Sequence, residues 1–429
     1  MSTNKDDSEL VDVQFLRIGM FVELDVGWLA HPFPTSSFKI TSDKQIETLR
    51  GLGLSRVRWV PSRSDRLLPD AKDAPTSEQT AEAAQEREMA ALREAQERKA
   101  RADLLASQQR ALAVCERRFA DSARQYKKTV ELVHSSPKEA ATQAGDMVAG
   151  FLRDMLTDGE SSIRLLSESA GDKSAMHPVN VTIVSLLLGK AMGMNADALQ
   201  DLGMAAFLHD IGKVQLPERV RWYEENFSTA EYKLYQDHVA QSVLLGKGME
   251  LSRTALLAIA QHHELADGSG FPARIKVESM SAGARVLALV NRYDNYCNPS
   301  RIAAALTPHE SLSLIFAQMK ARFDTVALSA FIRMMGVYPP GSVVQLIDDR
   351  YAIVVSVNSA RPLKPRILLH EPGVPKSEAL IVDLEQMPFL GIRRSLKPSA
   401  LPQVSLDYLA PRQRITYFFE QTDRPNEPE

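Results

Sequence analysis

The pattern of apolar and polar positions divides the chain into segments of different character. Between residues 11 and 62, short apolar runs alternate with turn residues. "DVQFLRIGMFVEL" and "SRVRWVP" have the pattern of strands, and "TSDKQIETLRGLG" has that of a capped helix ending at glycine. We therefore expect residues 1–75 to form a small α+β module.

The second segment, residues 76–124, is rich in Ala, Glu, Arg, Gln and Lys, as in "EREMAALREAQERKARADLL". These residue types favour a long solvated helix. The apolar positions Met89, Leu92, Leu104 and Leu105 are too few to define a coiled coil, so a charged linker helix is the favoured interpretation. A homodimer seam along this helix, or a rod that transmits a signal to protein partners, is the alternative.

The third segment, residues 125–335, is helical in pattern almost throughout. "VTIVSLLLGKAMG", "ADALQDLGMAAFLHDIG" and "SRTALLAIAQHH" carry apolar residues too densely for surface helices, so they should pack as a bundle. In the last segment, residues 336–429, "GSVVQLIDDRYAIVVSVNS" predicts a hairpin around Asp348 and Asp349. The expected fold class is mainly α, with a small α+β module first and a β-rich extension last.

Composition narrows the class of protein. A chain of 429 residues is too long for one core, and two cysteines cannot make a disulfide framework. A net charge of -3 gives no reason to expect a DNA partner. The polar, acidic start has neither a basic n-region nor an apolar h-region, so we do not expect a secretory signal, and no apolar run approaches the roughly 18 residues of a membrane span. A cytoplasmic protein is the expectation.

Histidines and one aspartate carry the candidate chemistry. Five of the nine histidines fall in the helical segment: His177, His209, His238, His262 and His263. Asp210 follows His209, and Lys213 lies one turn further on in "HDIGK", where Gly212 allows a close turn. One such histidine alone is more often an ordinary core or surface residue. Five at the ends of successive buried helices favour a metal site.

The chemistry of these side chains suits divalent Fe, Mn or Zn. One carboxylate can bridge two ions, and a two-metal site binds phosphoryl oxygens and makes hydroxide available near neutral pH. Asp210 is the candidate bridge. Lys213 is the candidate for stabilising charge on a phosphoryl oxygen.

"HDIGK" followed by "HHELADGSGFP" resembles the HD-GYP domain, a branch of the HD superfamily of metal-dependent phosphohydrolases. The family signature is HHE-x-x-D-G-x-G-Y-P, and Phe271 stands at the tyrosine position. The resemblance covers roughly residues 125–335 and implies an HD-type helical bundle. "LRIGMFVELDVGWLAHPF" is similar to an uncharacterised domain that often precedes HD-GYP, and "YLAPRQRITYFF" is similar to the tail of one subgroup.

The resemblance implies a set of site residues. Metal ligands fall on His177, His209, Asp210, His238, His262 and His263, and the phosphate-contacting lysine falls on Lys213. It also implies that Glu264 and Asp267 hold the following turn, and that Gly268, Gly270, Phe271 and Pro272 shape the loop beside the site.

Three positions depart from the family pattern. Lys173 replaces the glutamate of three-metal members, so two divalent ions are expected. Asn291 stands where the family has its last aspartate ligand, and its amide offers an oxygen without charge. Asp294 lies one turn later, and three roles are open for it: replacing the missing aspartate ligand, supporting a metal ligand from behind, or capping the helix. Asn180 replaces a common arginine, and the family's Arg-Pro-Tyr stretch is missing, leaving only Arg301 nearby.

Two functions follow from the resemblance. The first is a metal-dependent phosphodiesterase that hydrolyses cyclic di-GMP to pGpG, with further hydrolysis to GMP left open. The alternative is a catalytically weak HD-GYP protein that senses cyclic di-GMP and passes the signal to partner proteins. The departures at Lys173, Asn180 and Asn291 motivate the second, whereas the retained histidines favour the first. A hydrolase for another nucleotide is a more distant reading.

Overall fold

The computed structural model describes residues 8–26, 31–65, 77–157, 160–167, 173–224, 226–357 and 361–422. The chain divides into two compact units, Met1–Glu97 and Arg98–Glu429. The expected border between the first module and the linker, at residues 75 and 76, lies outside the described residues.

The N-terminal unit contains a four-stranded antiparallel sheet in the order β1-β4-β2-β3. Its elements are β1 (Glu9–Asp12), β2 (Phe21–Glu23), β3 (Ser37–Lys39), α1 (Asp43–Gly51) and β4 (Arg56–Trp59). Helix α1 packs its apolar side against the sheet, where Leu49 is buried with Val22 and Ile40. The small α+β module is thus confirmed, although a 3-10 turn at Val13–Phe15 interrupts the first expected strand.

Helix α2 (Ser77–Leu132) is the long charged helix. All of its side chains from residue 85 to 104 are exposed, including Met89 and Leu92. Further on, the same helix buries Cys115, Phe119 and Ala123 in the core of the second unit. The expected linker helix is therefore present, and its last turns belong to the helical bundle.

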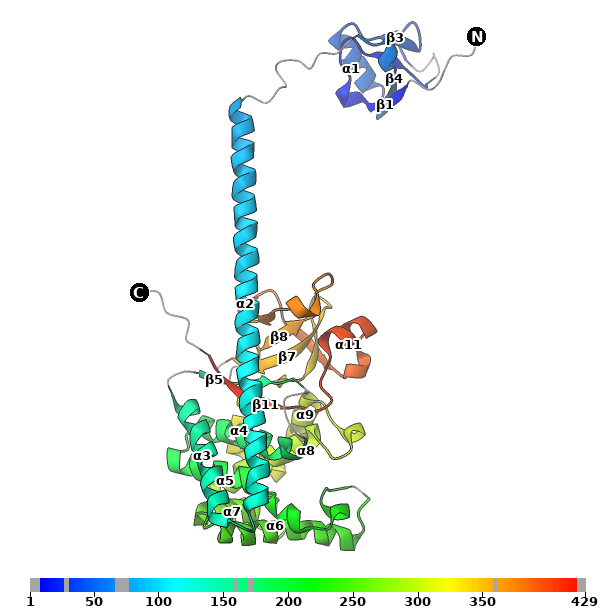
Figure 1. Cartoon of the computed structure of the whole chain (residues 1–429). Coiled ribbons are helices and arrows are strands. Elements are labelled where there is room, and N and C mark those ends of the chain that lie inside the picture. Colours follow the sequence, from blue (N-terminus) through cyan, green and yellow to red (C-terminus); the bar gives the residue numbers. More distant parts are fainter. Residues whose placement is uncertain are drawn as a thin grey trace. The chain divides into compact units, whose positions relative to one another are not determined.

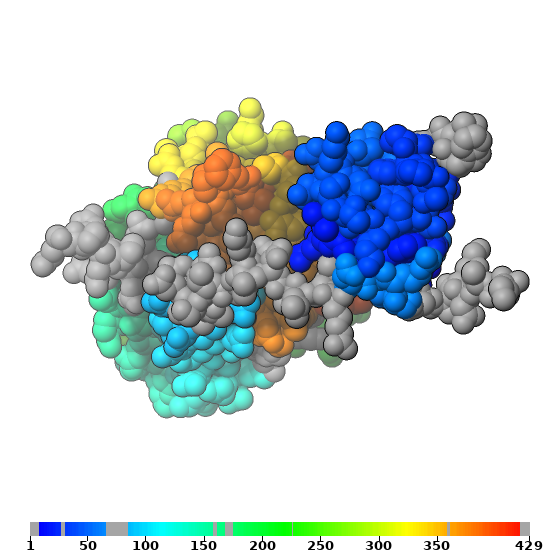
Figure 2. Space-filling model, turned by 90° about the horizontal axis from the view of Figure 1, so that it is seen from above, coloured from blue at the N-terminus to red at the C-terminus, as the bar shows by residue number. Residues whose placement is uncertain are grey.

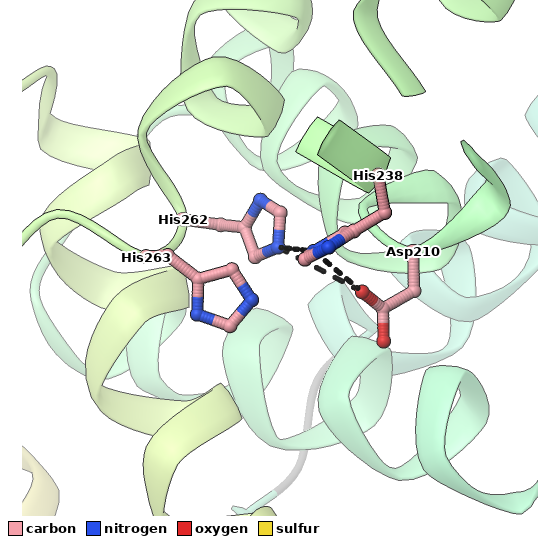
Figure 3. Close-up of side chains that lie close together, drawn as sticks. All are labelled: Asp210, His238, His262 and His263. Atoms are coloured by element: carbon pink, nitrogen blue, oxygen red, sulfur yellow. Dashed lines mark hydrogen bonds and ion pairs between the residues drawn. The ribbon is translucent and has the colours of Figure 1, made fainter. Parts of the chain in front are cut away.

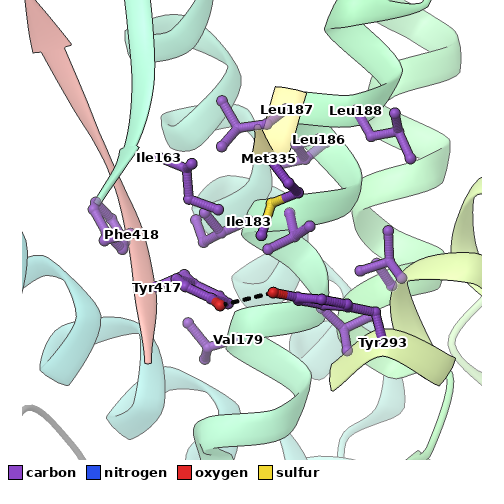
Figure 4. Close-up of a cluster of buried hydrophobic side chains, with 14 of the residues drawn as sticks. Ile163, Val179, Ile183, Leu186, Leu187, Leu188, Tyr293, Met335, Tyr417 and Phe418 are labelled. Atoms are coloured by element: carbon purple, nitrogen blue, oxygen red, sulfur yellow. Dashed lines mark hydrogen bonds between the residues drawn. The ribbon is translucent and has the colours of Figure 1, made fainter. Parts of the chain in front are cut away.

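The bundle of the second unit consists of α3 (Pro137–Leu156), α4 (Lys173–Ala191), α5 (Ala196–Leu208), α6 (Thr229–Gly248), α7 (Arg253–Gln261), α8 (Ala282–Cys297), α9 (Pro308–Gln318) and α10 (Thr325–Met335). Helix α4 lies at its centre and contacts α5, α8, α10 and β11 (Figure 1). Its apolar side chains, among them Val179, Ile183 and Leu186, are buried on all sides (Figure 4). The mainly α fold class is confirmed.

A seven-stranded antiparallel sheet completes this unit. Its strands are β5 (Glu160–Leu165), β6 (Val343–Leu346), β7 (Tyr351–Val357), β8 (Arg366–Leu369), β9 (Ile381–Asp383), β10 (Ile392–Leu396) and β11 (Tyr417–Thr422), and α11 (Gln403–Leu409) precedes β11. The predicted hairpin is confirmed: β6 pairs with β7 across a turn in which Asp349 has φ 69°. Figure 2 shows the orange residues of this extension directly against the yellow helical residues.

Strand β5 was not expected, because it lies inside the helical segment. It pairs with β11 and β7, so the bundle and the C-terminal extension share one sheet. Tyr417 of β11 strengthens this link: its hydroxyl lies 3.1 Å from the Tyr293 hydroxyl of α8 and donates to the Pro340 carbonyl (Figure 4). Within the described residues, no helix is both long and apolar enough to cross a membrane.

Candidate metal centre

The candidate ligands come together from four helices, although His238 lies in the middle of α6 and not at a helix end as expected. His177 lies in the first turns of α4, His209 caps the C-terminal end of α5 and is followed by Asp210, His238 lies in α6, and His262 caps α7 and is followed by His263. Figure 3 shows His238 of α6 converging near Asp210 with His262 and His263, which follow one another at the end of α7. Most of these side chains are buried. The structure places every histidine expected at the site within reach of Asp210 or of another ligand.

A glycine allows this convergence. The chain turns after Asp210 into the 3-10 helix η5 (Ile211–Gln215), which packs tightly on α6. The Gly212 amide donates to the Ser242 hydroxyl at 2.8 Å. A β-carbon on Gly212 would lie 2.3 Å from the His238 carbonyl oxygen, so the space admits no side chain. The close approach brings Asp210 opposite His238.

Asp210 joins two groups of ligands. Its Oδ2 atom lies 3.5 Å from His177 Nε2 and 3.4 Å from His209 Nε2. Its Oδ1 atom lies 3.4 Å from His238 Nε2 and 3.7 Å from His262 Nε2. The first group is suited to one cation, and the second, which His263 completes, to another. The carboxylate is the member common to both.

The tautomers of three rings follow from their neighbours. His209, His238 and His262 place Nδ1 at 2.7, 2.5 and 2.6 Å from the backbone carbonyl oxygen three residues earlier. A carbonyl oxygen only accepts, so we assign the proton of each neutral ring to Nδ1. Each Nε2 atom then presents a lone pair toward Asp210.

These lone pairs face one another without protons between them. His177 Nε2 lies 3.2 Å from His209 Nε2, and His238 Nε2 lies 3.3 Å from His262 Nε2. The Asp294 carboxylate lies 2.6 Å from His177 Nδ1 and holds the proton of that ring on Nδ1 as well, so neither pair can form a hydrogen bond. Asp210 Oδ1 and His263 Nε2 are also buried, with no hydrogen-bond partner in the part of the chain that the structure describes. Divalent cations would satisfy these groups, so the residues fit a metal site.

Burial keeps the rings neutral. It lowers the pKa of His209 to about 4 and that of His238 to about 3, even though the Asp210 carboxylate acts in the opposite direction. The pKa of His263 is lowered well below 6.5, first by burial and then by the neighbouring histidines. Near neutral pH all three rings therefore have their lone pairs available for a cation.

Asp210 and Lys213 form a buried ion pair, with Lys213 Nζ 2.6 Å from Oδ2. Burial alone would raise the pKa of Asp210, but Lys213 and His209 outweigh it and hold the pKa well below 3.8. Burial alone would lower the pKa of Lys213, but the Asp210 carboxylate raises it above 10.5. Lys213 Nζ also lies 5.3 Å from the centre of the Trp222 ring. Through its contact with Asp210, Lys213 places a positive charge beside the two groups of metal ligands.

The loop after the paired histidines is held by two carboxylates. The fully buried Glu264 accepts the amides of residues 273, 274 and 275 at 2.6, 3.1 and 3.2 Å. Asp267 accepts the Ser269 amide at 2.9 Å in a local turn. Gly268 has φ 80°, a region that favours glycine.

The end of this loop packs against a ligand. Gly270 leaves no room for a side chain, since a β-carbon there would lie 2.4 Å from the Leu265 amide nitrogen. The Phe271 ring stacks on His263, with centroids 4.4 Å apart and planes at 19°. Pro272 follows through a cis peptide bond and is exposed. The loop therefore orients His263 through an aromatic ring.

The residues at the departures from the signature have different environments. Asp294 accepts a hydrogen bond from His177 Nδ1 at 2.6 Å, so its carboxylate lies behind a candidate metal ligand. Asn180 is fully buried and donates to the other oxygen of Asp294 at 2.9 Å. Asn291 is buried, and its side-chain oxygen accepts from Asn295 at 2.7 Å. Lys173 begins α4, and its side chain lies outside the described residues.

A cavity of about 410 Å³ opens onto the two groups of candidate metal ligands. Aromatic side chains line one part of it: Trp222, Tyr223, Tyr232, Tyr235 and Phe271. Three cationic residues, Lys213, Arg292 and Arg414, line it as well. Sequence reasoning missed all of these except Lys213 and Phe271. No local motif marks the other residues, although Arg414 lies in "APRQRITYFF", which resembles the tail of one family subgroup.

Comparison with known proteins covers most of the chain. Residues 9–144 match a domain of unknown function (DUF3391), and residues 153–326 match the HD domain. The chain is 25% identical over 371 residues to "Cyclic di-GMP phosphodiesterase PA4108" of Pseudomonas aeruginosa, covering 83% of this chain and 84% of that protein.

Other relatives match a smaller part. The chain is 24% identical to "Cyclic di-GMP phosphodiesterase PdeB" of Borreliella burgdorferi over 45% of this chain and 51% of that protein. It is 27% identical to the "Cyclic di-GMP phosphodiesterase" of Thermotoga maritima over 44% of this chain and 51% of that protein. It thus spans about half the length of each of these two relatives. HD domains bind divalent metal ions, in keeping with the ligand groups around Asp210. The HD domain match and the curated relatives support the HD-GYP family, which the two long motifs indicated.

Proposed function

We propose that this protein is a metal-dependent phosphodiesterase that hydrolyses cyclic di-GMP to pGpG. One observation carries the proposal: the Nε2 lone pairs of His177, His209, His238 and His262 converge on the two oxygens of Asp210. They do so beside a cavity with aromatic and cationic walls. The activity named for the curated relatives supports the choice of substrate.

We infer that the site holds two divalent ions, such as Fe or Mn. His177, His209 and Asp210 would hold one, and Asp210, His238, His262 and His263 would hold the other. When bound, such ions polarise a phosphoryl oxygen and lower the pKa of water. With Asp210 common to both groups, the two positions are close enough to serve one phosphate.

The side chains around the cavity account for the rest of the chemistry. Lys213 carries its positive charge to the edge of the metal groups, where it offsets negative charge that develops on a phosphoryl oxygen. Trp222 and Tyr232 are aromatic and line the cavity, where they offer faces for guanine to stack on. The neutral histidines add no positive charge of their own, so the ions and Lys213 define where the phosphate that is hydrolysed binds.

The test combines metal content with turnover. The full-length protein is analysed for bound metal and assayed for conversion of cyclic di-GMP to pGpG and GMP with Mn²⁺ or Fe²⁺. The variant His209→Ala with Asp210→Ala should lose both metal and turnover, while His134→Ala, at an exposed position, should keep both. Turnover that survives in the double variant would rule out this site as the centre of hydrolysis.

The alternative is a catalytically weak sensor of cyclic di-GMP. It is favoured by Asn291, which places an uncharged amide where the family has an aspartate ligand. Under this reading, the exposed stretch of α2 from residue 85 to 104 would pair two protomers or contact signalling proteins. Stoichiometric metal and tight nucleotide binding without turnover would support it. For either function we propose a cytoplasmic location, where the nucleotide acts as a second messenger.

A further inference from the structure

We propose that Arg414, supplied by the C-terminal extension, binds a phosphate of the substrate. The inference rests on the proposed function and deepens it by assigning a substrate contact outside the helical domain. Arg414 lies just before β11 and outside residues 153–326, the part that matches the HD domain. It nevertheless lines the same cavity as His177, His262 and Lys213.

The guanidinium of Arg414 has unused hydrogen-bonding capacity. Its Nη1 atom donates to the Pro299 carbonyl at a long 3.4 Å, and its Nε atom is buried with no hydrogen-bond partner in the described ranges. Among the residues that the structure describes, it has no ion pair with a carboxylate. A partly buried guanidinium without a counter-charge is poised for an anion, and its fork of donors matches the oxygens of a phosphate.

The neighbouring backbone is fixed to the helices that carry the metal site. The Ile415 amide donates to Asn298 Oδ1 at 2.8 Å, and the Ile415 carbonyl accepts from both Asn180 and Asn298 at 2.8 Å. Two residues further on, the Tyr417 amide donates to Asn180 Oδ1 at 3.0 Å. Arg414 therefore projects from a segment tied to α4 and α8, which favours a fixed position over a mobile one.

The substrate needs more than one cationic contact. A cyclic dinucleotide carries two phosphates, and Lys213 is already paired with Asp210 at 2.6 Å. Arg292 lies with its guanidinium 5.9 Å from the Tyr296 ring. Arg301, the basic residue nearest to the missing Arg-Pro-Tyr stretch, is exposed and does not line the cavity. Arg414 thus offers a cation for the phosphate that is not being hydrolysed.

The test compares two arginines of the C-terminal extension. Arg414→Gln keeps most of the side-chain length and removes the charge. Arg393→Ala removes an exposed arginine that pairs with Asp349, and serves as the control. Binding is measured by calorimetry on the metal-loaded full-length protein with the hydrolysis-resistant bis-phosphorothioate of cyclic di-GMP. KM, kcat, metal content and melting temperature are measured on the same samples.

We expect Arg414→Gln to raise both the Kd of the analogue and the KM for cyclic di-GMP about tenfold or more, because a charge-assisted hydrogen bond to phosphate is lost. Metal content, the melting temperature and kcat should change little, and Arg393→Ala should match the wild type. Arg414→Lys should fall between them, since it keeps charge and loses the fork. If either Arg414→Gln or Arg414→Lys fails to fold, the other variant still tests the proposal.

The outcomes separate this inference from the proposed function. Wild-type Kd and KM in a folded Arg414→Gln protein would overturn the role of Arg414 while leaving hydrolysis intact. A wild-type protein that neither binds the analogue nor hydrolyses cyclic di-GMP would overturn the proposed function, and the role of Arg414 with it. A fall in kcat and metal content at unchanged KM would also overturn it, because Arg414 would then act on the metal site.

Discussion

Asp294 lies directly behind His177, with its Oδ2 atom 2.6 Å from the ring Nδ1. The other ring nitrogen, Nε2, faces His209 and Asp210. A carboxylate in this position fixes the tautomer of a ligating histidine and increases its basicity. The other oxygen of Asp294 accepts from Asn180 and Asn298, at 2.9 and 3.0 Å, so the carboxylate is itself oriented.

Replacing Asp294 by Asn should weaken metal binding about 10- to 100-fold, because the ring loses the charge that orients it. The measurement is a competition titration of Mn²⁺ against a chelator of known affinity. Asp146→Asn, at an exposed position of α3, is the control and should leave the affinity unchanged. Equal affinities for both folded variants would show that His177 does not depend on Asp294.

Asn291→Asp should tighten metal binding about tenfold, because it adds a negative charge beside the cations. Asn291 lines the cavity, and Asn295 Nδ2 already donates to its side-chain oxygen, so a carboxylate can replace the amide without losing that bond. The same titration measures the change, and turnover should rise with it if the family's aspartate position is a ligand. An unchanged affinity would mean that this side chain does not face the ions.

Gly212→Ala should damage the metal site through packing alone. The added methyl group would meet the His238 carbonyl oxygen and the Ser242 amide nitrogen, both at 2.3 Å, and both atoms are backbone. We expect a loss of about 1–3 kcal/mol in the free energy of unfolding, together with weaker metal binding.

The matched control is Gly145→Ala in α3, where a β-carbon meets nothing within 4 Å. That change should stabilise the protein by about 0.5–1 kcal/mol, because alanine is the better helix former. Urea unfolding of both variants gives the comparison. A Gly212→Ala protein with normal stability and normal metal affinity would show that η5 can move away from α6.

The metal-free protein should lose stability as the pH falls below 6.5. The folded protein holds the pKa of His209 at about 4 and that of His238 at about 3, against 6.5 in the unfolded chain. Between pH 6.5 and 4 the unfolded chain therefore binds more protons, and the free energy of unfolding falls as pH is lowered. Each ring contributes up to about 1.4 kcal/mol per pH unit in this window.

Urea unfolding of chelator-treated protein at several pH values measures this slope. Replacing His209 and His238 together by Asn should flatten it, whereas His134→Asn, at an exposed position, should not. Because the pKa of Asp210 is well below 3.8 in the folded protein, this carboxyl adds to the slope only as the pH approaches 3.8, where the unfolded chain begins to bind a proton there. The slope due to the histidines is therefore read in the upper part of the window. An equal slope in all three proteins would contradict neutral, buried rings.

Local sequence was sufficient for most of the helices, for the β6–β7 hairpin and for the ligand candidates. The density of apolar residues predicted the helices, and the turn residues around Asp349 predicted the β6–β7 hairpin. The two long motifs contain three of the five histidines and Asp210, whereas His177 and His238 were assigned only through the resemblance to the family. These features are encoded within a few residues, in the periodicity of side chains and in the chemistry of adjacent ligands.

Only the tertiary structure decided which distant residues complete the site. Strand β5 pairs with β11, more than 200 residues later in the chain, and this pairing fixes the position of the segment that carries Arg414. Asn180 was noted as a missing arginine, yet it is a buried amide that joins Asp294 to that segment. Such contacts leave no periodic trace in the sequence, because they depend on the folding of helices and strands that are far apart along the chain.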